Sequence, residues 1–295
     1  MNVIQLTGAL ELGLIYSIVA MGIYLSFRTL QFPDMTVDGS FPLGAAICAT
    51  CILHGMHPVT AIFIAMLGGA LSGFITALMS TRLKMLNLLA GILTMIALYS
   101  INLRIMGRPN MSLSGEKTIF NELFSYLAIP SVSTLLLPLL VIVVIVALAA
   151  LLFLRTELGL GLRAAGSNAK MARAKGINDQ RMIQLGLSIS NSFVALAGAL
   201  FAQTQGFADV TMGTGTIVYG LAAVILGEAL LSTRTVKQAL LACILGAILY
   251  RLVISIALNT HEFGLHSSDL QLVTAVIMVL AMQVPALKRH IKIIR

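Results

Sequence analysis

The stretch Ser131–Leu154 reads SVSTLLLPLLVIVVIVALAALLFL and decides the fold class, because its 24 residues include no charged side chain. A helix of about 20 mainly apolar residues, rising 1.5 Å per residue, crosses the roughly 30 Å hydrocarbon core of a bilayer. Strands of a membrane barrel would instead alternate apolar and polar side chains over about ten residues. The stretch therefore predicts a membrane-spanning α-helix.

Eight further stretches approach the same length and composition. Together they give nine expected spans, in chain order Ala9–Phe27, Asp38–His54, Pro58–Ser80, Met85–Ile105, Ser131–Leu154, Met182–Gln203, Thr214–Leu231, Thr235–Leu258 and Ser268–Leu287. The second and seventh are short and agree with either a full crossing or a re-entrant segment, so nine and ten spans are both compatible with the sequence. The sequence predicts a single all-α, polytopic membrane domain over residues 1–295, with about nine transmembrane helices, some of them short or discontinuous.

The overall composition agrees with a membrane location. Of the 295 residues, 58% are hydrophobic and only 10% are charged, whereas average soluble domains carry roughly 25% charged residues. So little charge cannot give a soluble chain of 31.4 kDa a polar surface. A soluble enzyme, a disordered chain and a nucleic-acid-binding protein are therefore excluded, and the formal net charge of +8 needs another explanation.

The cations gather in alternate connecting segments. If the C-terminus lies inside, the outer segments hold only Arg104, Arg108 and Lys117, and Arg251 falls within a span. Of the 19 Lys and Arg residues, 19 − 4 = 15 are then inside, as the positive-inside rule requires. The pattern predicts a multi-pass protein of the cytoplasmic (inner) membrane with its N-terminus outside and its C-terminus in the cytoplasm. Most of the net charge then reflects orientation rather than a surface for nucleic acid.

Two segments 175 residues apart resemble each other. Phe32–Gly39 reads FPDMTVDG and Phe207–Gly215 reads FADVTMGTG, so both share Phe-x-Asp-apolar-Thr-apolar followed by glycine. Five spans lie between them, and an odd number places equivalent points on opposite sides of the membrane. This predicts an inverted repeat in which residues 9–105 (spans one to four) are mirrored by residues 182–287 (spans six to nine), with residues 131–154 as the connecting helix.

The two short spans occupy matching positions in the two halves, which in transporters marks the substrate path. They begin at Asp38-Gly39-Ser40 and Thr214-Gly215-Thr216, where Ser, Thr or Asp can cap a helix whose first N–H groups stay free. Ordinary capping, close packing of small residues and hydrogen bonding between helices explain the same residues equally well. With two polar side chains near mid-span, the candidate pathway residues are Asp38, Ser40, Thr94, Asn191, Thr214 and Thr216.

Among the ionisable residues within expected spans, Glu228 and Arg251 are candidates for a role, because charge is costly there and indicates function. Glu228 lies near the cytoplasmic end of the seventh span and close in sequence to Arg234, which favours a gate or a structural ion pair. Arg251, late in the eighth span, either reaches the lipid headgroups or pairs with an acid.

Cys48 and Cys51 have CxxC spacing, but inside an apolar helix this favours packing. His54 and His57 flank a short outer loop without a carboxylate cluster, so no metal site is predicted.

Residues 155–181 form the longest inside segment and a candidate docking loop. Ser167-Asn168 can cap a short helix from Ala169 to Lys175, which Gly176 would end. A short helix of small and basic residues bracketed by glycines suits a groove on another protein, whereas a plain basic loop at the membrane surface would need only the charges. The residues expected to contact the partner are Arg163, Gly166, Ser167, Asn168, Ala172, Arg173, Lys175 and Gly176.

This loop resembles the coupling-helix segment of ATP-binding-cassette importer permeases, in the branch that contains branched-chain amino acid and ribose permeases. The family pattern is Arg-Ala-x-Gly-x-Asn followed by Ala-Arg/Lys-x-x-Gly-Ile-Asn, and Arg163–Asn168 and Ala172–Asn178 match it. The resemblance extends to Pro33–Ser40, Gly220–Gly227 and Leu245–Arg251. It is closest to the subgroup of amino-acid or tryptophan-type importers that are paired with a binding lipoprotein.

The resemblance implies an ATP-driven importer of a small polar solute, an amino acid or a related compound. Glu228 follows Gly227 where the ribose branch has a Gly-Gly pair, which argues against a sugar. The implied partners are a second permease copy in a homodimer, a cytoplasmic dimer of ATP-binding-cassette ATPases at residues 163–176, and an extracytoplasmic solute-binding protein.

The sequence contains no Gly-x-x-x-x-Gly-Lys-Ser/Thr phosphate loop. ATP and magnesium are therefore expected on the partner ATPase, and this chain is expected to be a transport subunit without enzymatic activity or a cofactor of its own. The alternative is a secondary transporter driven by an ion gradient, because inverted repeats serve that class too.

Overall fold

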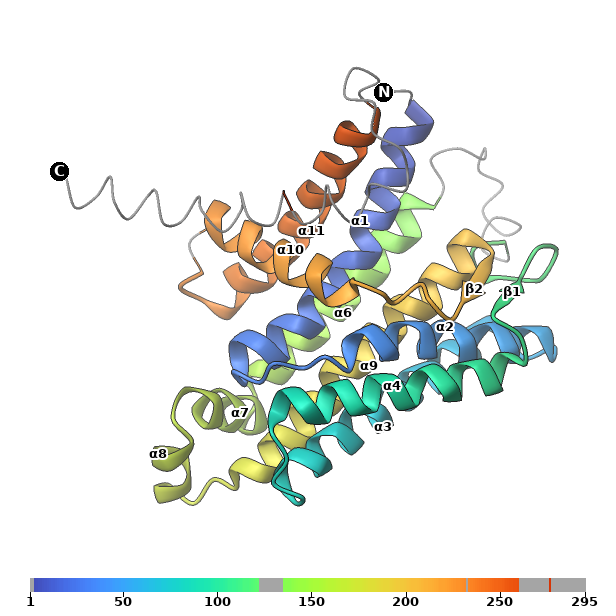
Figure 1. Ribbon diagram of the computed structural model, residues 1–295. Coiled ribbons are helices and arrows are strands. Elements are labelled where there is room, and N and C mark those ends of the chain that lie inside the picture. Colours follow the sequence, from blue (N-terminus) through green and yellow to red (C-terminus); the bar gives the residue numbers. More distant parts are fainter. Residues whose placement is uncertain (1–2, 122–134, 232, 260–275, 277–295) are drawn as a thin grey trace.

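Helices form at eight of the nine expected spans in the computed structural model, which describes residues 3–121, 135–231, 233–259 and 276 (Figure 1). Within this described part, six helices are long and apolar enough to cross a membrane. The helices at the second and seventh expected spans are shorter, with 17 and 15 residues. The ninth expected span, Ser268–Leu287, lies outside the described residues except for Val276, so the total of nine stays a prediction.

The elements are named as Figure 1 labels them. In chain order they are α1 (Val3–Ile23), its π-helical continuation η1 (Tyr24–Thr29), α2 (Val37–Leu53), α3 (Pro58–Thr81), α4 (Asn87–Met106), β1 (Asn110–Ser112), α6 (Leu136–Arg155), α7 (Glu157–Ser167), α8 (Ala169–Ala174), α9 (Asp179–Gln205), β2 (Phe207–Asp209), α10 (Thr216–Leu230) and α11 (Val236–Asn259). The two strands pair antiparallel, with Met111 opposite Ala208. This pairing holds the segment after α4 beside the segment that leads into α10.

The two segments that repeat in the sequence also share a local structure. Before α2, the carboxylate of Asp34 accepts a hydrogen bond from the N–H of Thr36 at 2.9 Å. Before α10, Asp209 accepts the equivalent bond from Thr211 at 2.7 Å. An aspartate that bonds the backbone two residues on forms an Asx turn, which redirects the chain. In both halves this turn leads into the short helix.

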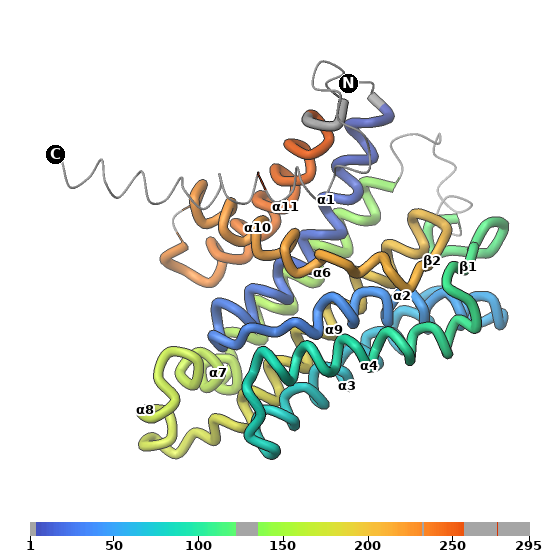
Figure 2. Tube along the Cα trace, in the orientation of Figure 1, coloured from blue at the N-terminus to red at the C-terminus, as the bar shows by residue number. Residues whose placement is uncertain are grey.

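In each half, the first helix packs against a helix of the other half. The first helix of one half, α1, lies along α11, and the first helix of the other half, α9, lies along α3 (Figure 2). α1 and α9 also contact each other, and each short helix packs against the first helix of the opposite half. Two similar halves around a shared centre produce this pattern, which agrees with the predicted repeat.

Apolar side chains are distributed as a membrane protein requires. The centre is filled by large buried side chains of α1 and α2, among them Ile15, Ile18 and Phe41. In contrast, α3 and α6 carry exposed apolar side chains such as Leu67 and Leu152 on their outer faces. In a soluble protein so much exposed apolar surface would promote aggregation, but here it faces lipid or another subunit.

Candidate functional site

The carboxylate of Asp38, in the first turn of α2, caps the N-terminus of α10. Its Oδ1 accepts a hydrogen bond from the N–H of Ile217 at 2.8 Å, and its Oδ2 accepts one from the N–H of Gly215 at 3.1 Å. The free N–H groups at a helix N-terminus carry partial positive charge, which a carboxylate stabilises. Asp38 therefore joins the short helices of the two halves directly.

This contact corrects the expectation that the two repeat segments lie at opposite faces of the membrane. Opposite faces are about 30 Å apart, whereas the starts of α2 and α10 lie within hydrogen-bonding distance. At least one of the segments that lead into them must enter the bundle. At 1.5 Å per residue α2 and α10 are only about 26 and 23 Å long, which is shorter than the hydrocarbon core. These lengths favour entry of both segments into the bundle. Discontinuous helices of this kind surround substrate sites in transporters.

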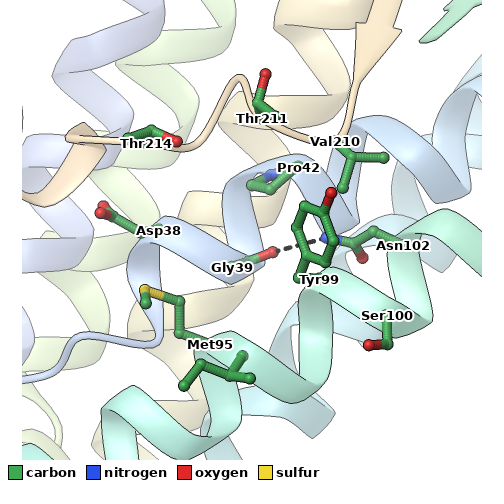
Figure 3. A pocket seen from close by; sticks show the side chains of 11 residues that line it. Asp38, Gly39, Pro42, Met95, Tyr99, Ser100, Asn102, Val210, Thr211 and Thr214 are labelled. Atoms are coloured by element: carbon green, nitrogen blue, oxygen red, sulfur yellow. Dashed lines mark hydrogen bonds between the residues drawn. The ribbon is translucent and has the colours of Figure 1, made fainter. Parts of the chain in front are cut away.

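A pocket of about 350 Å³ lies beside the contact, between the start of α2, the middle of α4 and the segment before α10 (Figure 3). Its wall is mainly apolar, with Pro42, Met95, Ile96, Tyr99 and Val210, and its polar side chains include Asp38, Asn102, Thr211 and Thr214. The size is in the range of small-molecule sites, which enclose roughly 300–1,000 Å³. A few polar groups in an apolar cleft are typical of a site that orients a small solute.

Asn102 lines the pocket and carries an acceptor that no described residue uses. Its side chain is fully buried, and its Nδ2 donates to the carbonyl of Gly39 at 3.3 Å. Its Oδ1 has no hydrogen-bond partner among the residues that the structure describes. A buried acceptor without a partner is uncommon and needs an explanation, of which a bound ligand or water is one.

Three of the candidate pathway residues lie in a separate, closed network. Asn191 on α9 donates to Asp34 at 2.7 Å and accepts from Ser40 on α2 at 2.6 Å. Thr94 on α4 accepts from Thr76 on α3 at 2.9 Å. All five side chains are buried, at 0 to 6% exposure. Thr36 links the two sets, because its N–H donates to Asp34 and its hydroxyl lies 2.7 Å from that of Thr76. The network therefore holds four helices together rather than lining the pocket.

The candidate pathway residues therefore divide into two groups. Asp38 and Thr214 line the pocket, whereas Ser40, Thr94 and Asn191 belong to the closed network. Thr216 stands apart from both groups. It is buried in the first turn of α10.

Replacing Asn191 by alanine is expected to destabilise the bundle without touching the pocket. The change removes the donor to Oδ2 of Asp34, whereas the Ser40 hydroxyl keeps Ser72 and the Thr36 carbonyl as partners. A buried polar group left unpaired costs about 1–3 kcal/mol. The midpoint of thermal unfolding in detergent should fall by several degrees. Ser188→Ala is the matched control, because the Ser188 hydroxyl bonds Gln184 of its own helix. An equal fall in both variants would contradict the proposed role of the network.

The two ionisable residues predicted as a gate or an ion pair lie in different places. Glu228, in the last turn of α10, forms an ion pair with Arg28 of η1 and not with its sequence neighbour Arg234. Arg251 on α11 lies over the ring of Tyr16, 5.8 Å from the ring centre. Arg251 therefore makes a cation–π contact within the bundle.

The predicted docking helix is present as α8. Asn168 caps it by accepting a hydrogen bond from the N–H of Met171 at 3.0 Å. Lys175 follows as its C-cap, and Gly176 has a φ of 81°, a left-handed conformation that favours glycine after a helix. Arg173 is 59% exposed and lies 3.6 Å from Asp179. The helix thus presents basic side chains to its surroundings.

Gly166, in the last turn of α7, packs directly against η1. A Cβ atom at this position would overlap the carbonyl oxygen of Thr29. The coupling loop, defined here as α7, α8 and the residues up to α9, therefore touches the end of the first helix. Figure 1 shows α7 and α8 together at one end of the bundle.

The sequence did not single out several residues that the structure places at these sites. Tyr99 and Thr211 line the pocket, and Arg28 pairs with Glu228. For Thr211 a signal existed, because it is the repeat counterpart of Thr36. For Arg28 none existed, because its partner lies 200 residues away.

Comparison with known proteins gives consistent matches. The family model described as "Branched-chain amino acid transport system / permease component" matches residues 5–282. The tyrosine transport system permease protein of Clostridioides difficile (strain R20291) is 40% identical over 267 residues, covering 90% of this chain and 86% of that protein. The ribose import permease protein RbsC of Bacillus subtilis (strain 168) is 27% identical over 233 residues, covering 78% of this chain and 67% of that protein.

The fold also has a counterpart among solved structures. It is similar to a structure described as an inward-facing conformation of a putative metal-chelate type ABC transporter. The TM-score is 0.52 at 18% sequence identity, and the match covers 97% of this chain and 87% of the other.

Proposed function

The chain belongs to the family of permease components of branched-chain amino acid transport systems and is the permease of an ATP-binding-cassette importer, and we propose that it carries an amino acid with an apolar or aromatic side chain past Asp38. The observation that supports this solute is the pocket at the start of the two short helices. Asp38 and Oδ1 of Asn102 are acceptors for an ammonium group. The hydroxyl of Thr214 is a donor for a carboxylate, whereas that of Thr211 already donates to Asp209.

The apolar wall of the pocket supports the class of side chain. Met95 offers a thioether, Tyr99 a ring and Val210 methyl groups to a solute. Burial of such a group contributes about 25 cal/mol per Å² of apolar area. The tyrosine transport permease that is 40% identical to this chain is consistent with this class.

The exposed side of the pocket is evidence for a second permease copy that covers it. Thr211 and Thr214 are exposed, and the backbone from Val210 to Gly215 is not helical. Irregular backbone at membrane depth is tolerated only against protein or a water-filled cavity. We therefore place the second copy of a homodimer across this face, with the solute path between the copies.

The remaining partners follow from the importer class. A cytoplasmic ATPase pair would bind at α8 and supply the site for ATP and magnesium, and a solute-binding protein would deliver the solute at the outer face. The coupling loop then lies in the cytoplasm, and the N-terminus lies outside.

Uptake measurements test the solute class. Membrane vesicles with the complete importer should accumulate labelled L-tyrosine, L-phenylalanine or L-leucine, and unlabelled ribose should not compete. Uptake should stop when ATP is depleted and continue when an uncoupler removes the ion gradient. Competition by ribose alone would overturn the solute class, and the opposite response to ATP and uncoupler would favour a secondary transporter.

Arg173→Glu is expected to uncouple ATP hydrolysis from uptake while the protein still folds. In the Arg173–Asp179 pair the Arg173 side chain is 59% exposed, and exposed pairs contribute only about 0–1 kcal/mol to stability. Reversal of a charge at a docking surface opposes a partner arranged for the original charge, so uptake should fall by roughly tenfold or more. Lys117→Glu, the same change in the segment after β1, is the matched control. Unchanged uptake and ATPase co-purification in Arg173→Glu would count against docking at α8.

A further inference from the structure

Arg28 and Glu228 form an ion pair that connects the end of the first helix to the end of α10. Arg28 lies in η1, and Glu228 lies in the last turn of α10, 200 residues later in the chain. Their side chains are 54% and 21% exposed. A pair with this much exposure contributes little to stability. Its position between η1 and α10 is therefore a better guide to its role than its contribution to stability.

η1 is also the element that the coupling loop touches. Gly166 of α7 packs against the Thr29 carbonyl with no room for a Cβ atom, so α7 cannot move toward η1 without displacing it. η1 itself is π-helical, and short π-helical segments inside longer helices often occur at functional sites. A displacement of the coupling loop would therefore act on Thr29, which is the residue next to Arg28.

α10 leads from the ion pair to the pocket. Glu228 lies near its C-terminus, and its N-terminus is held by the carboxylate of Asp38. A helix of 15 residues is a stiff element of about 23 Å. Movement of one end is therefore transferred to the other end, where Asp38, Gly215 and Ile217 meet beside the pocket.

We propose that the Arg28–Glu228 pair is a strut that makes η1 and α10 move together, so that motion of the coupling loop is transmitted to the pocket at the start of α10. Arg28 and Glu228 are positioning residues and do not touch the solute. The proposal rests on the proposed docking of the ATPase at the coupling loop. It assigns Arg28 a role that requires an acidic partner on α10 rather than positive charge at the membrane surface.

A charge exchange tests the strut. Arg28→Glu and Glu228→Arg should each lower the amount of solute taken up per ATP hydrolysed, by roughly 2- to 30-fold. The double variant should recover most of the loss, because it restores an ion pair at the same place. Arg82→Glu is the control, since it reverses a charge after α3 that has no ion-pair partner among the described residues.

The readouts separate the strut from the docking of the ATPase. Co-purification of the ATPase and its basal hydrolysis should stay as in the wild type in all four variants, with uptake measured for labelled L-tyrosine, L-phenylalanine and L-leucine. Loss of co-purification in the wild type itself would overturn the proposed docking. With docking intact, wild-type coupling in both single variants, or no recovery in the double variant, would overturn the strut.

Cross-linking tests whether the pair stays together during transport. In a Cys243→Ala background, Arg28→Cys with Glu228→Cys can be joined by a short bis-methanethiosulfonate reagent and released by reductant. A strut stays closed through the cycle, so joined protein should retain uptake within about twofold of the released protein. Uptake that stops on joining and returns on release would show that the pair must open, and would overturn the proposal. Each single cysteine variant, treated in the same way, controls for modification without a link.

Discussion

Asp38→Ala is expected to lower uptake by on the order of 100-fold, the largest effect of any substitution at the pocket. The change removes both hydrogen bonds to the N-terminus of α10, at 2.8 and 3.1 Å. Hydrogen bonds to a charged group contribute about 1.5–3 kcal/mol each, and about 1.4 kcal/mol corresponds to a factor of ten in rate. It also removes the acceptor proposed for the ammonium group of the solute. Initial uptake rates of labelled L-tyrosine, L-phenylalanine and L-leucine, normalised to the amount of protein in the membrane, measure the effect.

Asp38→Asn separates the two roles of this carboxylate. Asparagine has the same shape and can still accept from the N–H of Ile217 through its Oδ1, but it offers no negative charge to an ammonium group. We expect a smaller loss of thermal stability than in Asp38→Ala, together with a raised KM for uptake. If Asp38→Ala transports at the wild-type rate, neither the cap nor the pocket takes part in transport.

The eight spans within the described residues were predictable because each depends on a local property of the sequence. Long apolar runs such as Leu136–Arg155 form helices in a membrane whatever packs around them, since the backbone must satisfy its own hydrogen bonds there. The Asx turns before α2 and α10 likewise depend on residues two apart. The capped helix α8 belongs to the same class, because Asn168 and Gly176 act on neighbouring backbone.

The contact between Asp38 and α10 was not predictable from the sequence. The acceptor is a side chain, but the donors are backbone N–H groups, which every residue except proline carries. No residue type at Gly215 or Ile217 therefore reveals the partner. The repeat indicated that the two short helices are equivalent. Because the repeat is inverted, however, their starts were expected on opposite sides of the membrane. Only the packing of the two halves brings them together.

Two further differences have physical reasons. α7 was not expected as a helix, because Gly159 and Gly161 lower its intrinsic propensity by about 1 kcal/mol each; both glycines are buried in the structure, as is Leu162, and tertiary packing stabilises the helix instead. The partner of Glu228 was sought at Arg234, which is near in sequence, whereas the end of α10 lies against Arg28. Sequence proximity is a poor guide to ion pairs between helices that end at the same side of a bundle.

Gly198→Ala is expected to cause a large loss of stability, although it adds only one methyl group. Gly198 lies in α9 where α2 crosses it, and a Cβ atom there would overlap the carbonyl oxygen of Phe41. No rotamer change can relieve a clash between a Cβ atom and backbone, so the two helices must move apart. Overpacking of this kind costs about 1–3 kcal/mol or more, which corresponds to a fall of roughly 5 °C or more in the midpoint of thermal unfolding.

Gly8→Ala is the matched control for this substitution, because the same methyl group would meet no atom within 4 Å there. At this partly buried position of α1, alanine should leave the midpoint unchanged or raise it slightly, since glycine is the poorer helix former by about 0.5–1 kcal/mol. Gly198→Ala should also reduce uptake, because α2 carries Asp38 one turn before Phe41 and any separation of α2 from α9 displaces that carboxylate from the N-terminus of α10. Equal midpoints for the two variants would mean that α2 and α9 do not approach as closely as described, and the position of Asp38 would then lose its support.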